Sequence, residues 1–200
     1  MSLIQNTLQP SLYLPSNFST ILGWLTIEEA FFLQQMTWFA SGLPGCLVEI
    51  GSYCGRSAVA IGEALRQGCC GKLYCVDPQV DNKEVYGIDS LGEFLYNTKE
   101  LNKLGFVYGL RSTSVNAAES FNFNVKMLFI DGLHDYENVK QDFTLWIPKV
   151  IKQGFVLFHD SFEDGPQQVI SEALQSNPQE WLCVNQVGTI TVLKRCFNEK

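Results

Sequence analysis

Acidic residues close four of the five strands that the sequence predicts before its C-terminal hairpin. Glu49, Asp77, Asp131 and Asp160 each end or follow a short apolar run. In a parallel sheet these carboxyl ends meet at one edge, where ligands of open α/β sheets bind. Clustered carboxylates repel one another unless a cation, a metal ion or raised pKa values relieve the repulsion. The pattern predicts an electronegative pocket, although each acid taken alone is also typical of a helix N-cap or turn.

Both histidines of the chain fall at the same edge. His134 lies three residues after Asp131, and His159 directly precedes Asp160. A neutral imidazole accepts a proton readily near pH 7, so His134 is a candidate general base. His159 is a candidate metal ligand or orienting neighbour. A hydrogen bond that ties a loop is the structural alternative for either residue.

A glycine turn follows the first predicted strand and precedes a helix that opens near Arg56. Gly51 and Gly55 allow backbone to approach a ligand where a Cβ atom would clash. Their spacing is not the Gly-x-Gly-x-x-Gly of dinucleotide binders, and the phosphates of NAD or ATP would meet an acidic edge. S-adenosylmethionine carries a sulfonium and an ammonium and has no phosphate. The acidic edge therefore favours S-adenosylmethionine over NAD.

The elements that must position these residues alternate along the chain. Apolar runs predict strands over residues 47–50, 72–76, 106–110, 127–130 and 155–158, then a hairpin over 181–194. Helical patterns occupy residues 30–40, 58–66, 115–120, 136–151 and 167–175, and a capping box of Thr26 and Glu29 precedes the first. A further helix is capped by Ser90 and runs to Leu104. This order predicts an α/β fold: a doubly wound, mostly parallel seven-stranded sheet with a C-terminal antiparallel hairpin.

Length and composition indicate one domain over residues 1–200, with residues 1–45 as an N-terminal helical cap. Residues 79–89 are polar and are a candidate lid. Aromatic residues near the cap either pack in the core, which helical spacing favours, or cover the substrate pocket. They are Phe18, Trp24, Phe31, Phe32 and Trp38.

Charge and cysteine content restrict the partners. A net charge of −7 disfavours nucleic acid and anionic membranes, because both require a basic face. No apolar run is long enough for a membrane span, and the first residues do not read as a signal peptide. Seven cysteines, an odd number, favour reduced thiols in a cytoplasmic protein.

Four stretches together resemble a known family, the class I S-adenosylmethionine-dependent methyltransferases. The resemblance extends from about Gly23 to Lys194 and is greatest to small-molecule O-methyltransferases, including those that modify macrolide sugars. The stretches are Val48-Glu49-Ile50-Gly51-Ser52-Tyr53-Cys54-Gly55-Arg56-Ser57, Tyr74-Cys75-Val76-Asp77, Phe129-Ile130-Asp131-Gly132-Leu133-His134-Asp135-Tyr136 and Gly154-Phe155-Val156-Leu157-Phe158-His159-Asp160.

The resemblance implies S-adenosylmethionine as cofactor and assigns its contacts. The methionine part would lie against Glu49, Gly51, Ser52 and Gly55, and Tyr53 and Ser57 would also bind the cofactor. Asp77 would bind the ribose hydroxyls, and Thr113 and Ser114 would border the adenine. Asp131 would lie beside the methionine end and face the substrate, as a catalytic residue together with His134.

The substrate end departs from the family pattern. Some relatives bind a divalent ion with an acid after strand four and an acidic pair after strand five, whereas strand five here ends in His159-Asp160. Asp131, His159 and Asp160 are therefore candidate ligands for Mg²⁺ or another divalent ion.

The sequence favours a methyltransferase that acts on a hydroxyl of a small molecule or sugar. Two alternatives stay open, a nicotinamide-dependent oxidoreductase on a related fold and a non-catalytic S-adenosylmethionine-binding protein. A homodimer is compatible with the sequence, which does not decide the oligomeric state.

Overall fold

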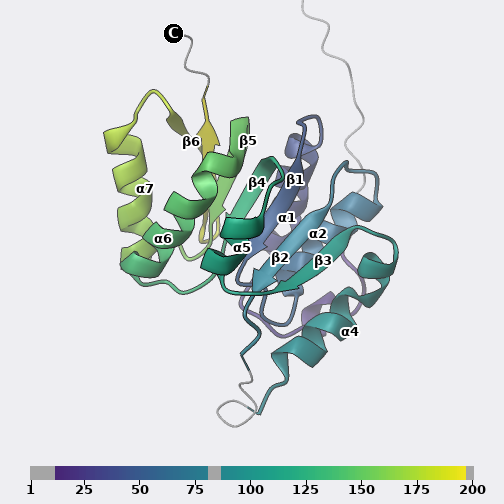
Figure 1. Cartoon of the computed structure of the whole chain (residues 1–200). Helices are drawn as coiled ribbons and strands as arrows, with labels where there is room; N and C mark the ends of the chain where they lie inside the picture. Colours follow the sequence, from purple (N-terminus) through teal and green to yellow (C-terminus); the bar gives the residue numbers. More distant parts are fainter. Residues whose placement is uncertain (1–11, 81–86, 197–200) are drawn as a thin grey trace, which may run out of the picture.

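A seven-stranded sheet with helices on both faces forms the protein in the computed structural model, which describes residues 12–80 and 87–196 (Figure 1). The strand order is β3-β2-β1-β4-β5-β7-β6, and β7 runs antiparallel to both of its neighbours. The strands are β1 (Cys46–Ile50), β2 (Leu73–Asp77), β3 (Val107–Arg111), β4 (Val125–Ile130), β5 (Val150–Phe158), β6 (Trp181–Val187) and β7 (Ile190–Arg195). The predicted fold class is confirmed.

The helices divide between the two faces of the sheet. One face is covered by α1 (Ile27–Ala40), α2 (Arg56–Arg66) and α4 (Ser90–Lys103), and the other by α5 (Ser114–Ser120), α6 (Tyr136–Trp146) and α7 (Asp164–Ser176) (Figure 1). Each face has its own apolar core because side chains alternate along a strand. Met127 and Phe129 of β4 pack under the first group, and Leu128 and Ile130 under the second.

The order of strands brings the predicted functional residues together. The strands β1 and β4 are neighbours at the centre of the sheet, and both are buried along their whole length. Such continuous burial is typical of central parallel strands covered on both faces. The connection after β1 leads to α2 on one side and the connection after β4 leads to α6 on the other. A crevice at this reversal is where doubly wound folds bind ligands.

Several predicted boundaries were wrong, each for a local reason. The predicted helix 136–151 ends at Trp146, because Pro148 lies in a short 3-10 turn over Ile147–Lys149. The strand β5 consequently begins at Val150 instead of residue 155. The last helix begins at Asp164, before the predicted residue 167, since a proline is tolerated in a first turn.

The N-terminal caps of two helices were predicted with unequal success. The capping box of Thr26 and Glu29 opens α1, as predicted. The predicted cap Ser90 is instead the first residue of α4, and Asp89 caps that helix by accepting a hydrogen bond from the backbone N–H of Gly92.

The segment before α1 packs onto the domain, where Phe18, Ile21 and Leu25 are buried. Phe32 is also buried in the core, and Trp38 packs against this core. The prediction of core packing is therefore confirmed for Phe18, Phe32 and Trp38. Trp24 differs, with 77% of its surface exposed. Residues 1–11 of the expected cap and residues 81–86 of the expected lid lie outside the described residues. No helix in the described ranges has the length and apolar character needed to cross a membrane.

Candidate active site

Two adjoining cavities lie at the carboxyl ends of the central strands. One has a volume of about 480 Å³ and the other about 540 Å³. Both are lined by Trp24, Gly51, Tyr53, Asp131 and Leu133, so together they form one cleft with a shared middle. We call the first the histidine cavity, because His134 and His159 line it, and the second the Asp77 cavity.

The glycine turn after β1 forms the floor of this shared middle. Gly51 has φ +85°, and a Cβ atom there would lie 2.1 Å from the carbonyl oxygen of Asp131. The loops that leave β1 and β4 are therefore packed as closely as backbone allows, which requires glycine. Tyr53, at φ 43°, stacks beside Trp24 with ring centroids 5.2 Å apart. The exposed Trp24 thus forms part of the cleft wall.

Asp77, at the end of β2, holds the turn as well as lining its cavity. Its Oδ2 atom accepts a hydrogen bond from the backbone N–H of Tyr53 at 2.9 Å, and its Oδ1 atom accepts one from Gln79 at 2.7 Å. Tyr53 and Gln79 both have positive φ. A carboxylate has about four acceptor positions, so two bonds to the backbone leave capacity for a ligand hydroxyl.

Glu49 is fully buried beneath the turn and lines neither cavity directly. Neither of its carboxylate oxygens has a protein hydrogen-bond partner in good geometry. Burial raises the pKa of Glu49 to about 7, although the hydroxyls of Ser57 and Ser52 lie near enough to oppose that rise. Ser52 and Ser57 themselves line the histidine cavity. A buried carboxylate without a partner suits the ammonium group of a bound ligand.

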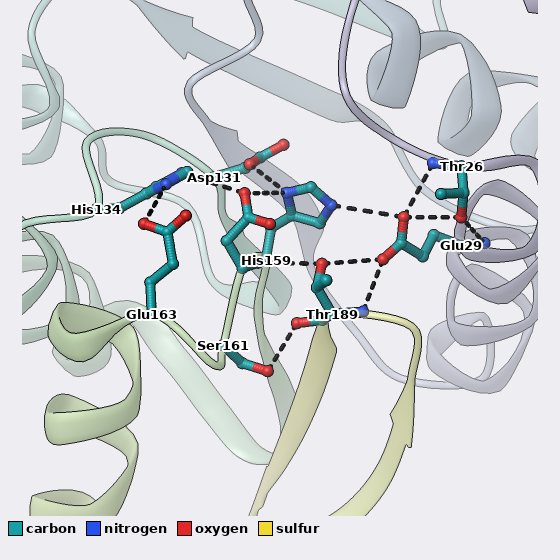
Figure 2. Close-up of polar contacts among 9 residues, drawn as sticks. Thr26, Glu29, Asp131, His134, His159, Ser161, Glu163 and Thr189 are labelled. Atoms are coloured by element: carbon teal, nitrogen blue, oxygen red, sulfur yellow. Dashed lines mark hydrogen bonds and ion pairs between the residues drawn. The ribbon is translucent and has the colours of Figure 1, made fainter.

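A buried imidazole joins three carboxylates from three elements (Figure 2). The Nδ1 atom of His159 lies 2.9 Å from Oδ1 of Asp131 and 3.0 Å from Oδ2 of Asp160. Neither oxygen is aligned with a ring N–H, so these are ion pairs and not linear hydrogen bonds. Burial by itself would lower the pKa of His159, but the contact with Asp131 and the charges of Asp160 and Glu29 outweigh burial and raise it to about 9. His159 is therefore a cation at neutral pH.

Glu29 supplies the third carboxylate, and sequence reasoning identified it only as a helix cap. Its Oε2 atom lies 3.7 Å from Nε2 of His159, and its Oε1 atom accepts hydrogen bonds from the N–H and hydroxyl of Thr189 at 2.7 and 2.9 Å (Figure 2). Burial opposes its ionisation, but the bonds from Thr189 and Thr26 lower the pKa of Glu29 to about 2. One charged side chain thus joins α1, the β6–β7 turn and His159.

His134 lies on the loop after β4, at the outer side of the same cluster (Figure 2). Its Nδ1 atom is 3.0 Å from Oε2 of Glu163, and its Nε2 atom is 3.5 Å from Oδ2 of Asp160. Glu163 precedes α7, and sequence reasoning missed it as a site residue because it follows no predicted strand directly. A carboxylate on one imidazole nitrogen fixes the tautomer and leaves the other nitrogen to accept a proton.

Three side chains could hold a metal ion together. Asp131, His134 and Asp160 each offer a ligand atom, and these atoms lie within 4.8 Å of one another. The histidine in this group is His134, whereas the sequence suggested His159, whose ring lies between the two carboxylates instead. Two carboxylate oxygens and an imidazole are ligands that suit Mn²⁺ and, less well, Mg²⁺.

The loop after β3 and the helix α6 also line the Asp77 cavity. Thr113 caps α5 and Ser114 begins it, and both line the cavity. Gln141 and Asp142 of α6 line the cavity as well. No sequence signal pointed to these two residues, since they lie inside a helix and not at a strand end.

Comparisons with known proteins agree with this architecture. A family model described as a methyltransferase domain matches residues 48–161. The structure of the O-methyltransferase NovP has a TM-score of 0.64 at 16% identity and covers 88% of this chain and 84% of its own. The O-methyltransferase TomG from Streptomyces achromogenes was solved in complex with S-adenosylmethionine. Its structure has a TM-score of 0.67 at 12% identity, and the match covers 94% of this chain and 92% of TomG. At these identities the likeness shows the fold.

One curated relative resembles part of the chain. The uncharacterized protein y4gI of Sinorhizobium fredii is 29% identical over 129 residues, which is 62% of this chain. The match spans only 14% of the length of that relative.

Proposed function

The chain belongs to the methyltransferase-domain family, and on that premise we propose that it transfers a methyl group from S-adenosylmethionine to a hydroxyl of a small molecule or sugar. The observation that carries this proposal is the shared cleft. Its Asp77 cavity has at one side an acid that would bind ribose hydroxyls, and it meets the histidine cavity at the glycine turn and Asp131. Cofactor and acceptor would therefore meet beside Asp131 and His134.

The reaction is an in-line displacement, in which the acceptor oxygen forms a bond to the methyl carbon and the carbon–sulfur bond breaks. The cofactor supplies an activated methyl group on its sulfonium, and the electron pair of the broken bond stays on sulfur. The protein must align the acceptor and remove its hydroxyl proton. His134 would accept that proton at Nε2, since Glu163 contacts Nδ1. Asp131 would orient the acceptor.

The acceptor would enter the histidine cavity, whose wall includes Trp24, Leu133 and Arg56. Should a divalent ion bind, Asp131, His134 and Asp160 would hold it, and it would lower the pKa of the acceptor hydroxyl. In that case turnover falls with a chelator and returns with Mn²⁺ or Mg²⁺. Full turnover by chelated enzyme would show that these side chains act without a metal.

We also propose a cytoplasmic location, a small-molecule acceptor and a homodimer. A cytoplasmic location is supported by the seven cysteines, all of which are free thiols in the structure. A small-molecule acceptor is supported by the size of the cleft, whose two cavities have volumes of about 480 and 540 Å³.

The test is transfer of isotope-labelled methyl from S-adenosylmethionine to a panel of sugars, phenols and other small hydroxyl compounds. We expect label in at least one hydroxyl compound and release of S-adenosylhomocysteine. Tight binding of S-adenosylhomocysteine with no transfer to any member of a broad panel would favour a non-catalytic binding protein.

A further inference from the structure

The outward face of α1 is apolar, unlike the outward faces of α6 and α7. Of its fourteen residues, eight are buried. The remaining six, which we call the outer arc, are Ile27, Glu28, Phe31, Gln35, Trp38 and Phe39. Four of the six are apolar, whereas the exposed positions of α6 are Glu137, Gln141 and Thr144, and those of α7 are polar as well. Apolar side chains all round a helix are typical of one that is covered on all sides.

One row of exposed side chains runs along the outer arc. Its members, spaced by four residues, are Ile27, Phe31, Gln35 and Phe39. Rows of this spacing are the ridges by which helices most often pack against one another. Ile27 is 42% exposed, Phe31 37% and Phe39 51%. Trp38 lies beside the row, with its ring edge-on to Phe39 at 5.1 Å between centroids. The outer arc therefore presents a packing ridge to its surroundings.

The row is symmetric about its polar member. Gln35 lies four residues after Phe31 and four residues before Phe39. If a second copy of α1 crosses the first in the antiparallel sense, with a two-fold axis at Gln35, each Phe31 meets the partner's Phe39. The two Gln35 amides then meet on the axis, and they can pair because an amide both donates and accepts. An isologous interface requires such a self-complementary patch.

The distribution of charge favours a second copy over a charged partner. The chain has a net charge of −7, so two copies repel one another over most of their surfaces. The outer arc carries one charge, on Glu28, and α1 contains no lysine or arginine. In the antiparallel arrangement the two Glu28 residues lie about 20 Å apart along the helices, at a rise of about 1.5 Å per residue. This separation exceeds the screening length of about 8 Å, so the two acids repel only weakly.

The exposed apolar area is of the size that a dimer needs. Leu22 and Trp24, which are 45% and 77% exposed, lie shortly before α1 and extend the apolar surface at its N-terminal end. Together with the apolar members of the row they present about 500 Å², at roughly 200 Å² for each whole side chain. A stable interface buries about 800 Å² on each partner, and somewhat more than half of this area is apolar. The surface is therefore sufficient for one such interface.

We propose that the outer arc of α1 is the interface of the homodimer, with Gln35 of both copies on the two-fold axis. This inference rests on the homodimer proposed above and does not depend on methyl transfer. Burial of Phe31 and Phe39 against each other removes apolar surface from water and stabilises the pair.

The experiment is sedimentation velocity of the full-length chain over a wide range of concentrations. Wild type should sediment with the mass of two chains. Gln35→Glu and Gln35→Lys each place two like charges on the axis, so each should raise the dissociation constant of the dimer by about tenfold or more. Gln35 is exposed, so both variants should keep the circular dichroism of the folded chain. If one variant fails to fold, the other measures the repulsion by itself.

An equimolar mixture of the two Gln35 variants should restore the dimer, because glutamate then meets lysine on the axis. Gln175→Glu and Gln175→Lys, at an exposed position of α7, are matched controls that should associate like wild type.

Three results would contradict the inference. Wild type that sediments as a single chain would overturn both the homodimer and this interface, and would assign the outer arc to another segment of this chain or to a different protein. Dimers that persist in both Gln35 variants would overturn this interface alone, as would a mixture that stays monomeric. None of these results bears on the proposed methyl transfer.

Discussion

The Oδ2 atom of Asp77 lies 2.9 Å from the backbone nitrogen of Tyr53, so the acid at the end of β2 is bonded to the glycine turn after β1. Tyr53 is in the left-handed region at φ 43°, a conformation that costs energy for a residue with a side chain. The hydrogen bond from its N–H helps to hold that conformation. The predicted ribose acid therefore also shapes the turn that would face the methionine part of the cofactor.

Replacing Asp77 tests this double role. Asp77→Ala should weaken S-adenosylhomocysteine binding by about ten- to a hundredfold, because charge-assisted bonds to ribose hydroxyls contribute roughly 1.5–3 kcal/mol each at most. It should also lower the melting temperature by freeing Tyr53 and Gln79. Calorimetry and thermal unfolding on the same variant measure both effects. Unchanged affinity in the folded variant would place the ribose elsewhere.

The close packing of Gly51 against Asp131 predicts a severe effect for a single methyl group. Gly51→Ala should destabilise the protein by at least about 1–3 kcal/mol and abolish cofactor binding, since the new Cβ atom would displace the carbonyl of Asp131. Gly42→Ala is the matched control, because a Cβ atom there meets nothing within 4 Å. Equal stabilities of the two variants in urea would show that the loops are not packed as described.

The buried charges around His159 make stability depend on pH. The pKa of His159 is raised from 6.5 to about 9, so its contribution is complete below pH 6.5 and is lost as the pH rises through 9. Glu29 has its pKa lowered from 4.5 to about 2, so its contribution is present above pH 4.5 and is lost as the pH falls through 2. Glu49 has its pKa raised from 4.5 to about 7, so its contribution is complete below pH 4.5 and is lost as the pH rises through 7.

Urea unfolding at pH 6 and pH 9 should therefore give a lower free energy of unfolding at pH 9, by at most about 3 kcal/mol from His159. His159→Gln should flatten this dependence. A wild type that is equally stable at both pH values would contradict an imidazolium at this position.

Substitutions of His134 and Glu163 distinguish a catalytic role of His134 from a structural one. His134→Ala should lower single-turnover methyl transfer by about 10²–10⁴-fold and leave S-adenosylhomocysteine affinity nearly unchanged. Glu163→Gln should lower the rate of methyl transfer less, because the amide oxygen of glutamine can still accept a hydrogen bond from Nδ1 of His134. If His134 only holds its loop in place through hydrogen bonds, the alanine variant will lose thermal stability and keep its turnover at low temperature.

Sequence patterns were sufficient for the sheet and for the residues at the strand ends. Glu49, Asp77 and Asp131 could be placed at one edge because parallel strands share a direction and helices alternate with them. Their roles toward the cofactor stay predictions.

The contacts that define the site depend on segments far apart in the chain. Glu29 and Thr189 are 160 residues apart, and only the folded sheet brings the capping glutamate of α1 to the β6–β7 turn. Asp142 lies on the buried side of a helix, where no periodic pattern distinguishes a cavity from the core. The end of α6 was missed because its apolar period continues past Pro148.

The most direct test of this account is a calorimetric titration of the wild-type protein with S-adenosylhomocysteine near pH 7.5, beside a titration with NAD. We predict saturable binding of one S-adenosylhomocysteine per chain, weakened by about ten- to a hundredfold in Asp77→Ala, and no heat from NAD. Saturable binding of NAD, with none of S-adenosylhomocysteine, would contradict a methyltransferase site in this cleft.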